Sequence, residues 1–238
     1  MKDKIDKLNE IIKNAKKIVF FGGAGVSTES GIPDFRSKDG LYNSNIDNSE
    51  YLLSHYCFIN EPEKFFNFYF NKMIYDDVMP NNCHKKLKEL EDKGKLTAVI
   101  TQNIDSLHQK AGSKNVIELH GNVNYLICTK CGKKYSLKDI KRSGTPRCLC
   151  GGILKPDVVL YGEALDEDVI KKTINEIENA DTLIVGGTSL VVYPAAGFIN
   201  FFHGKNLVII NKNKTHADKM ATLVINDSIA KVFSNLNV

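Results

Sequence analysis

Six short apolar runs, separated by helical stretches, are the feature that most constrains this chain of 238 residues. Each run is rich in Val, Ile or Leu and does not alternate with polar residues, which is typical of strands buried on both faces. The runs lie at 17–23, 96–103, 115–121, 182–188, 207–212 and 222–227. Buried strands that alternate with helices predict an α/β protein with a Rossmann-like, doubly wound parallel sheet.

Two regions interrupt this alternation. Helices are expected at 81–94, 104–111, 166–179 and 193–203, but residues 38–80 contain no good strand, and residues 122–156 contain four clustered cysteines with many Lys, Gly and Pro. We expect both regions to be insertions that pack together as a smaller domain. This divides the chain into a Rossmann-like domain formed by 1–37, 81–121 and 157–238 and a small domain formed by 38–80 and 122–156.

The four clustered cysteines have the spacing of a metal site. Cys128 and Cys131 form a C-x2-C pair, and Cys148 and Cys150 form a C-x-C pair shortly afterwards. Two close pairs at this separation suit a tetrahedral Zn²⁺. Because all four ligands come from the protein, no position remains for water, so the expected zinc is structural. The alternative is four free or paired thiols, which a chain of this length without an export signal disfavours.

Charge and hydropathy bear on partners and location. The net charge is +4, and no Lys/Arg cluster is interleaved with aromatic residues, so no specific nucleic-acid binding is predicted. No run reaches 18 apolar residues, so no membrane span is expected. The N-terminal residues lack the apolar segment of a signal peptide, and a reducing, cytoplasmic location is therefore expected. Nothing in the sequence indicates an oligomeric state.

A glycine-rich stretch, GAGVSTESGIPDFRS, follows the first predicted strand. A strand, a Gly-rich turn and a helix start can bind a pyrophosphate, with Gly23 and Gly25 forming the tight turn. The dinucleotide fingerprint G-x-G-x-x-G is incomplete, however, because Thr28 occupies the place of its third glycine. The stretch is therefore either an ordinary turn or a nucleotide site with a task other than hydride transfer.

Further polar residues follow other strands. The stretch IVGGTSLVVYPAA repeats the strand-glycine-hydroxyl pattern, and Asn211 follows the next strand, where it could hold a ribose hydroxyl or be a simple turn residue. The carboxyl ends of parallel strands meet at one edge, so Gln102, Asn103, Asp105 and His120 should converge there. His120 is the candidate general base, although an isolated histidine is more often structural.

These motifs occur together in one known family. GAGVSTESGIPDFRS, TQNIDSLHQKAG, IELHGN, the cysteine pairs, LKPDVVLYGEAL, GGTSLVVYPAA and IINKNKT appear in the order seen in sirtuins. From about Val19 to the C-terminus, the chain resembles this family of NAD-dependent protein deacylases, and its compact length resembles a bacterial member. The resemblance implies that the acetyl group of an acetyl-lysine passes to ADP-ribose. Nicotinamide, O-acetyl-ADP-ribose and free lysine would be released.

The resemblance also implies roles for individual residues. His120 would be the catalytic base and Asn103 a second catalytic residue. Acetylated protein or peptide substrates would bind as an added strand along Val159, Tyr161 and Gly162. The co-substrate NAD⁺ would contact Gly23, Ala24, Gly25, Thr28, Phe35, Arg36, Gln102, Asn103, Ile104, Asp105, His120, Gly187, Thr188, Ser189, Asn211 and Ile229.

The chain departs from the family pattern at several positions. Gly22 replaces a common Thr, Ser106 replaces a common Gly, and the second cysteine pair is C-x-C. Members that remove succinyl groups carry Tyr and Arg three residues apart, whereas Tyr42 is followed here by Asn45, which favours an uncharged acyl group.

Two alternative functions stay open. One is NAD-dependent protein ADP-ribosyl transfer. The other is a non-catalytic module that binds acetyl-lysine, which the presence of His120 and the intact QNID motif disfavours. An oxidoreductase is disfavoured by the missing third glycine.

Overall fold

The computed structural model describes residues 1–35, 40 and 48–237 of the chain. Its main element is a six-stranded parallel sheet in the order β3-β2-β1-β7-β8-β9. The strands are β1 (Ile18–Gly22), β2 (Leu96–Thr101), β3 (Val116–Glu118), β7 (Thr182–Gly186), β8 (Asn206–Ile210) and β9 (Leu223–Ile225). The predicted Rossmann-like sheet and all six of its strands are confirmed. The chain runs outward from β1 in one direction and from β7 in the other, so the β1–β7 junction is the switch point at which ligands bind in such sheets.

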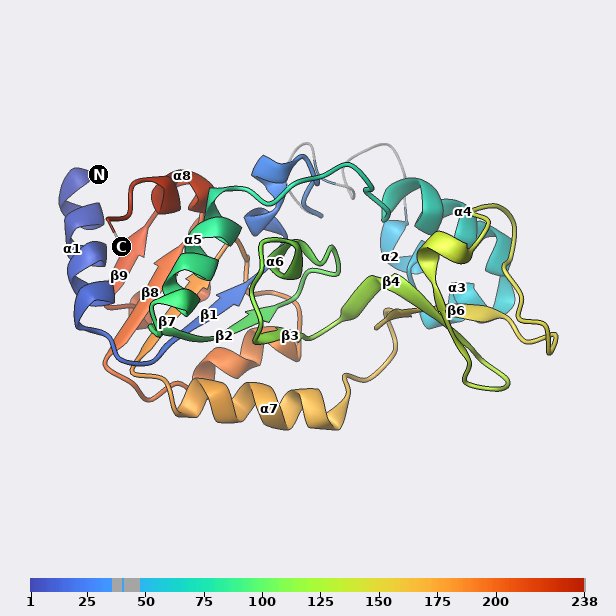
Figure 1. Ribbon diagram of the computed structural model, residues 1–238. Coiled ribbons are helices and arrows are strands. Elements are labelled where there is room, and N and C mark those ends of the chain that lie inside the picture. The colour runs from blue at the N-terminus through green and yellow to red at the C-terminus, as the bar shows by residue number, and fades with distance from the viewer. Residues whose placement is uncertain (36–39, 41–47, 238) are drawn as a thin grey trace.

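Helices cover both faces of the sheet (Figure 1). Successive strand residues point to opposite faces, so Ile18 and Phe20 lie in one apolar cluster, while Val19 and Phe21 lie in another. The first cluster packs under α1 (Lys2–Asn14), α5 (Asn82–Asp92) and α8 (Ile229–Ser234), and the second under α7 (Glu167–Glu178) and the 3-10 helix η4 (Ala195–Phe201). Burial of both faces explains why the strands are apolar throughout.

Two predicted helices differ from the structure. The helix expected at 193–203 is η4, a 3-10 helix, and the one expected at 104–111 is the single turn α6 (Leu107–Lys110). The second helix starts late because Ser106 has a left-handed φ of 57°, which interrupts helical geometry at that residue. Glycine adopts a left-handed φ without strain, which explains why the family pattern has a common Gly at the position of Ser106.

The two insertions share one apolar cluster. Helices α2 (Ser49–Leu52), α3 (His55–Asn60) and α4 (Pro62–Lys72) lie beside a three-stranded antiparallel sheet of order β5-β4-β6 (Figure 1). Its strands, which the sequence did not predict, are β4 (Gly121–Cys128), β5 (Lys134–Ser136) and β6 (Leu154–Val158). Phe58, Phe65 and Phe66 from the helices pack with Leu126 and Leu154 from this sheet. This contact supports the proposed small domain, whose boundaries stay a prediction.

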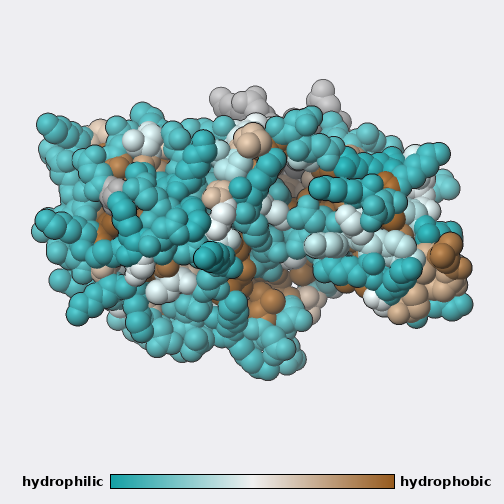
Figure 2. All heavy atoms as spheres, viewed as in Figure 1, coloured by the Kyte–Doolittle hydropathy of each residue, from teal (hydrophilic) through white to brown (hydrophobic). Residues whose placement is uncertain are grey.

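The remaining short elements are 3-10 helices, and the surface is largely polar. They are η1 (Ala24–Val26), η2 (Thr28–Ser30), η3 (Leu137–Asp139) and η5 (His216–Met220). The face drawn in Figure 2 is mostly hydrophilic. Among the described residues, no helix combines the length and the apolar character needed to cross a membrane.

A pair of histidines is buried where α5 and α6 meet, next to Phe20 of β1. His84 of α5 and His108 of α6 are 0% and 1% exposed, and their ring centroids lie 4.7 Å apart. The Asn81 N–H faces His84 Nδ1 at 3.3 Å, whereas neither ring nitrogen of His108 has a partner within the part of the chain that the structure describes. Burial lowers the pKa of His84 to about 4, and burial together with the nearby His84 lowers the pKa of His108 well below its usual value. Both rings are therefore neutral in the folded protein at pH 7.

This pair predicts acid sensitivity. Above the unfolded-state histidine pKa of about 6.5, the two imidazoles are neutral in both the folded and the unfolded chain. Below this pH, they bind protons in the unfolded chain but stay neutral in the folded chain. For His84 alone, the free energy of unfolding should fall by about 2 kcal/mol between pH 7 and pH 5. Urea unfolding at pH 7 and pH 5 measures the loss, which should be smaller in His108→Leu. An equal loss in this variant would contradict the assignment.

Candidate functional site

The predicted site residues gather at the carboxyl edge of the parallel sheet. Gly23 follows β1, Gln102 follows β2, His120 lies two residues after β3, Gly187 follows β7 and Asn211 follows β8. Ile229 begins α8 after β9. Arg36, Tyr42 and Asn45 lie outside the described residues.

The two glycine turns at the switch point touch through their backbones. The Gly25 N–H donates to the Gly187 carbonyl at 2.8 Å, and the Gly23 N–H donates to the Gly186 carbonyl at 3.2 Å. A Cβ on Gly25 would lie 2.8 Å from the Gly187 Cα, and one on Gly187 would lie 2.5 Å from the Val26 nitrogen. These glycines are therefore required for the packing of one turn on the other.

The helix expected to start within the first turn is not formed, and this expectation was wrong. The turn continues instead as the 3-10 helices η1 and η2. The Thr28 hydroxyl donates to the Gly25 carbonyl at 3.2 Å, which folds the turn back on itself. These short 3-10 helices lack the dipole of a full α-helix, so an anionic ligand there would be bound by individual N–H and hydroxyl groups.

A buried hydroxyl links the first turn to the loop after β2. The Ser27 hydroxyl donates to Asp105 Oδ2 at 2.7 Å, and Asn103 Nδ2 donates to the Ser27 hydroxyl at 3.0 Å. The Leu107 N–H donates to Asp105 Oδ1 at 2.8 Å. Burial raises the pKa of Asp105, and these hydrogen bonds oppose the rise. The sequence marks Ser27, 1% exposed, only as a hydroxyl donor of the glycine turn. Its hydrogen bond to Asp105 was not predicted, because the two residues lie in loops far apart along the chain.

His120 has a defined tautomer. Its Nδ1 lies 2.9 Å from the Gln102 carbonyl oxygen, which can only accept a hydrogen bond, so Nδ1 carries the proton and Nε2 keeps its lone pair. Burial lowers the pKa of His120, and the hydrogen bond to Gln102 opposes this. A neutral imidazole with a free Nε2 is suited to accept a proton near pH 7.

Other predicted residues contact the site less directly. Gln102 Nε2 donates to the Thr188 hydroxyl at 3.2 Å, which joins the end of β2 to the β7 turn. The Asn211 amide donates to the Asn213 carbonyl at 2.9 Å and so helps to close its own turn. The Ile229 side chain is buried against Gly186, which leaves its backbone for contact with a ligand. Ser189 is exposed, and the side chains of Phe35 and Ile104 pack against the small-domain cluster.

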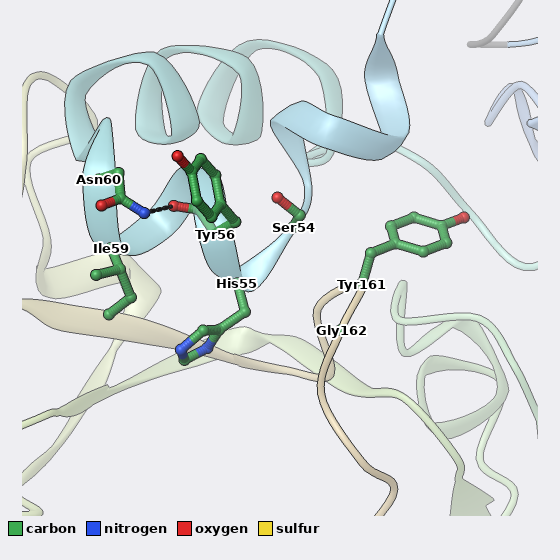
Figure 3. A pocket seen from close by; sticks show the side chains of 7 residues that line it. All are labelled: Ser54, His55, Tyr56, Ile59, Asn60, Tyr161 and Gly162. Atoms are coloured by element: carbon green, nitrogen blue, oxygen red, sulfur yellow. Dashed lines mark hydrogen bonds between the residues drawn. The ribbon is translucent and has the colours of Figure 1, made fainter.

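The expected peptide segment follows β6 and is already paired along part of its length. The Val159 N–H donates to the His120 carbonyl at 3.0 Å. The Tyr161 N–H donates to the Leu53 carbonyl at 3.1 Å, and the Tyr161 carbonyl accepts from the His55 N–H at 2.9 Å. A groove of about 510 Å³ lies between this segment and α3; Figure 3 shows Ile59 and His55 projecting from the helix and Tyr161 from the segment. The groove is lined by residues other than those of the glycine turns.

The four cysteines come together at one end of the small antiparallel sheet, where β4 ends at Cys128. All four sulfurs lie within 4.8 Å of one another, with 3.4 Å between Cys128 and Cys150 and 3.7 Å between Cys131 and Cys148. A tetrahedral zinc with Zn–S bonds of about 2.3 Å separates its sulfurs by about 3.8 Å. The Lys130 and Cys131 N–H groups lie 3.4 Å and 3.5 Å from the Cys128 sulfur, as in a zinc knuckle. The donor set fits the predicted structural zinc.

Comparison with known proteins decides the family. The sequence profile described as "Sir2 family" matches residues 23–194, which is more than half of the chain. The chain belongs to the Sir2 family. A relative from Clostridium perfringens named "NAD-dependent protein deacetylase" is 60% identical over 242 residues and covers 99% of each chain. One of the same name from Staphylococcus aureus is 47% identical over 240 residues, also with 99% coverage of each.

Solved structures of Sir2 proteins have the same fold. One with a deacetylated p53 peptide and 3′-O-acetyl ADP ribose has a TM-score of 0.91 at 37% identity and covers 98% of this chain and 96% of that one. A Sir2 homologue in complex with NAD has a TM-score of 0.87 at 39% identity and covers 96% and 90%. The prediction that this chain is a sirtuin is confirmed.

The contact between the glycine turns predicts the effect of a single methyl group. Gly25→Ala should lower the free energy of unfolding by about 1–3 kcal/mol and weaken NAD⁺ binding, because the new Cβ would press on the Gly187 backbone. Urea unfolding and calorimetric titration with NAD⁺ measure the two effects. Gly197→Ala is the control, since its Cβ would meet the nearest ring atoms at 3.7 Å. A Gly25→Ala protein as stable as the wild type would refute the packing argument.

The cysteine cluster predicts one bound zinc ion per chain. Cys148→Ser should lose the metal, because three ligands bind Zn²⁺ far less firmly than four. Cys57→Ala removes a buried thiol outside the cluster and should keep its zinc. Atomic emission of the purified proteins measures the metal. A metal-free wild type that unfolds identically with and without added Zn²⁺ would rule out the site.

Proposed function

We propose that this chain is an NAD-dependent protein-lysine deacetylase in which His120 is the general base. The observation that carries the proposal is the position of the His120 ring. Its Nδ1 is held by the Gln102 carbonyl, and its Nε2 is left as an acceptor at the edge where the two glycine turns and Asp105 meet. The names of the curated relatives and the ligands of the Sir2 structures support the same activity.

NAD⁺ supplies the ADP-ribose that accepts the acyl group. The two glycine turns, with Ala24, Thr188 and Ser189, are proposed to hold its phosphates and adenosine. Asn211 and the backbone of Ile229 are proposed to complete that side. Phe35 and Arg36 are proposed to border the nicotinamide half. These assignments agree with the positions of the described residues along the carboxyl edge of the sheet.

The protein groups near His120 have separate proposed tasks. His120 Nε2 takes up a proton, because burial keeps the imidazole neutral. Asp105, held by Ser27 and by the Leu107 N–H, is proposed to bind the nicotinamide amide together with Ile104. Asn103, whose amide is fixed on Ser27, is proposed as the second catalytic residue.

Peptide binding is supported by a Sir2 structure with a p53 peptide and NAD⁺, which has a TM-score of 0.85 at 39% identity. We propose that the acetylated peptide adds as a strand along Val159–Gly162. Because the N–H and carbonyl of Tyr161 already pair with residues 53–55 and the Val159 N–H pairs with His120, we propose that the added strand pairs with the backbone of Gly162. The preference for acetyl over succinyl groups and the cytoplasmic location remain predictions.

ADP-ribosyl transfer to protein is the second candidate, since it would use the same NAD⁺ site with a different acceptor. The curated relatives named as deacetylases make it the less favoured one. The acetyl-lysine-binding module without turnover is disfavoured by a histidine held with a free Nε2.

The base assignment predicts a large loss of rate. His120→Ala should lower kcat/KM for an acetyl-lysine peptide by about 10²- to 10⁴-fold, because the variant lacks the proposed proton acceptor. The assay follows nicotinamide and deacetylated peptide together. His216→Ala, on the exposed η5 turn, should keep full activity. Full activity in His120→Ala would refute the role of the histidine. Nicotinamide release with label transferred to protein, and no deacetylated peptide, would favour ADP-ribosyl transfer.

A further inference from the structure

The segment proposed to receive the peptide ends in a tight turn. The Glu163 N–H donates to the Leu160 carbonyl at 2.9 Å, which closes a four-residue turn. Gly162, at its third position, has a φ of 89°, as a type II turn requires. The turn therefore fixes the direction in which the backbone of Tyr161 and Gly162 faces.

The side chain of Glu163 folds back over the same turn. Its Oε2 accepts a hydrogen bond from the Leu160 N–H at 2.9 Å. Together with the bond from the Glu163 N–H to the Leu160 carbonyl, this makes two hydrogen bonds between the two residues. Leu160 is 4% exposed, so its N–H would have little access to water without the carboxylate. An unpaired buried N–H is costly, and the turn would have to open to solvate it.

Two side chains from different elements hold the same carboxylate. Lys155 Nζ of β6 lies 2.9 Å from Glu163 Oε2, and His55 Nδ1 of α3 lies 2.9 Å from Oε1. The side chains of Glu163 and Lys155 are 19% and 24% exposed, whereas that of His55 is 51% exposed, so the contact with Lys155 is the better shielded from solvent. Partial burial raises the pKa of Glu163, but the hydrogen bonds from Leu160, His55 and Lys155 outweigh it and lower the pKa overall. Glu163 is therefore an anion that joins β6, the turn and α3.

We propose that Glu163 is a positioning residue for the substrate peptide: its carboxylate holds the Leu160–Glu163 turn, and with it the backbone of Gly162, in the geometry that an added strand needs. The inference rests on the proposed function. Glu163 itself need not touch the acyl-lysine or NAD⁺, since its oxygens are occupied by Leu160, Lys155 and His55.

The test compares Michaelis constants in the full chain. Glu163→Ala should raise KM for an acetyl-lysine peptide by about 10- to 100-fold, the range expected for lost charge-assisted hydrogen bonds. KM for NAD⁺ and kcat at saturating peptide should stay within about 2-fold, because the glycine turns and His120 are untouched. Glu163→Gln keeps an acceptor for the Leu160 N–H and should raise the peptide KM less than Glu163→Ala.

A matched control separates positioning from general stability. Asp157→Asn removes a carboxylate of β6, which pairs with Lys134 at 2.9 Å, and should leave the peptide KM unchanged. A purely structural role would reduce the active fraction, and therefore kcat, at constant KM. Unchanged peptide KM in Glu163→Ala, or equal increases for peptide and NAD⁺, would overturn the proposal. If Glu163→Ala does not fold, Glu163→Gln decides by the same criteria. A wild type without deacetylation would instead refute the proposed function.

Discussion

The close contact between two glycine turns is the constraint on which the site depends. Gly25 and Gly187 meet backbone to backbone at the one place where the strand order reverses. Side chains at these positions would push β1 and β7 apart at their carboxyl ends. With the turns in contact, Thr188 lies within reach of Gln102, and Ser27 within reach of Asp105. The arrangement of these polar groups therefore depends on the absence of side chains at Gly25 and Gly187.

Burial then gives these groups their chemistry. A carboxyl group and an imidazole both favour their neutral forms when water is removed, so the pKa of Asp105 rises and the pKa of His120 falls. Hydrogen bonds act in the opposite direction at each group. The donors around Asp105 favour its anion, and the Gln102 carbonyl fixes the proton of His120 on Nδ1. The result is an imidazole whose Nε2 keeps its lone pair and a carboxyl group held by the Ser27 hydroxyl and the Leu107 N–H.

The residues after β6 connect the two parts of the molecule. Val159 is bonded to His120 at the sheet edge, and Tyr161 is bonded to Leu53 beside the helical insertion. Glu163 adds an ion pair with Lys155 of β6 and a hydrogen bond with His55 of α3. A peptide that lies along this segment would therefore touch both parts at once. The cysteine cluster is separate from this chemistry. It lies at one end of the small sheet, whose apolar cluster also packs against α3 and α4.

The sequence by itself determined the six buried strands and the cysteine pairs, because these are evident from local composition and spacing. It also indicated the family, because several motifs resemble those of sirtuins in the same order. It predicted Asp105 and His120 at one edge, since the ends of parallel strands meet there. It did not predict strands β4 to β6, which are short and partly exposed, or the 3-10 geometry that replaces the expected helix after Gly23. Only the tertiary structure decided which partners the polar groups find. Ser27 meets Asp105 across 78 residues, and Glu163 meets His55 across 108. Contacts at such separations depend on how the whole chain closes, and for that reason no short motif contains them.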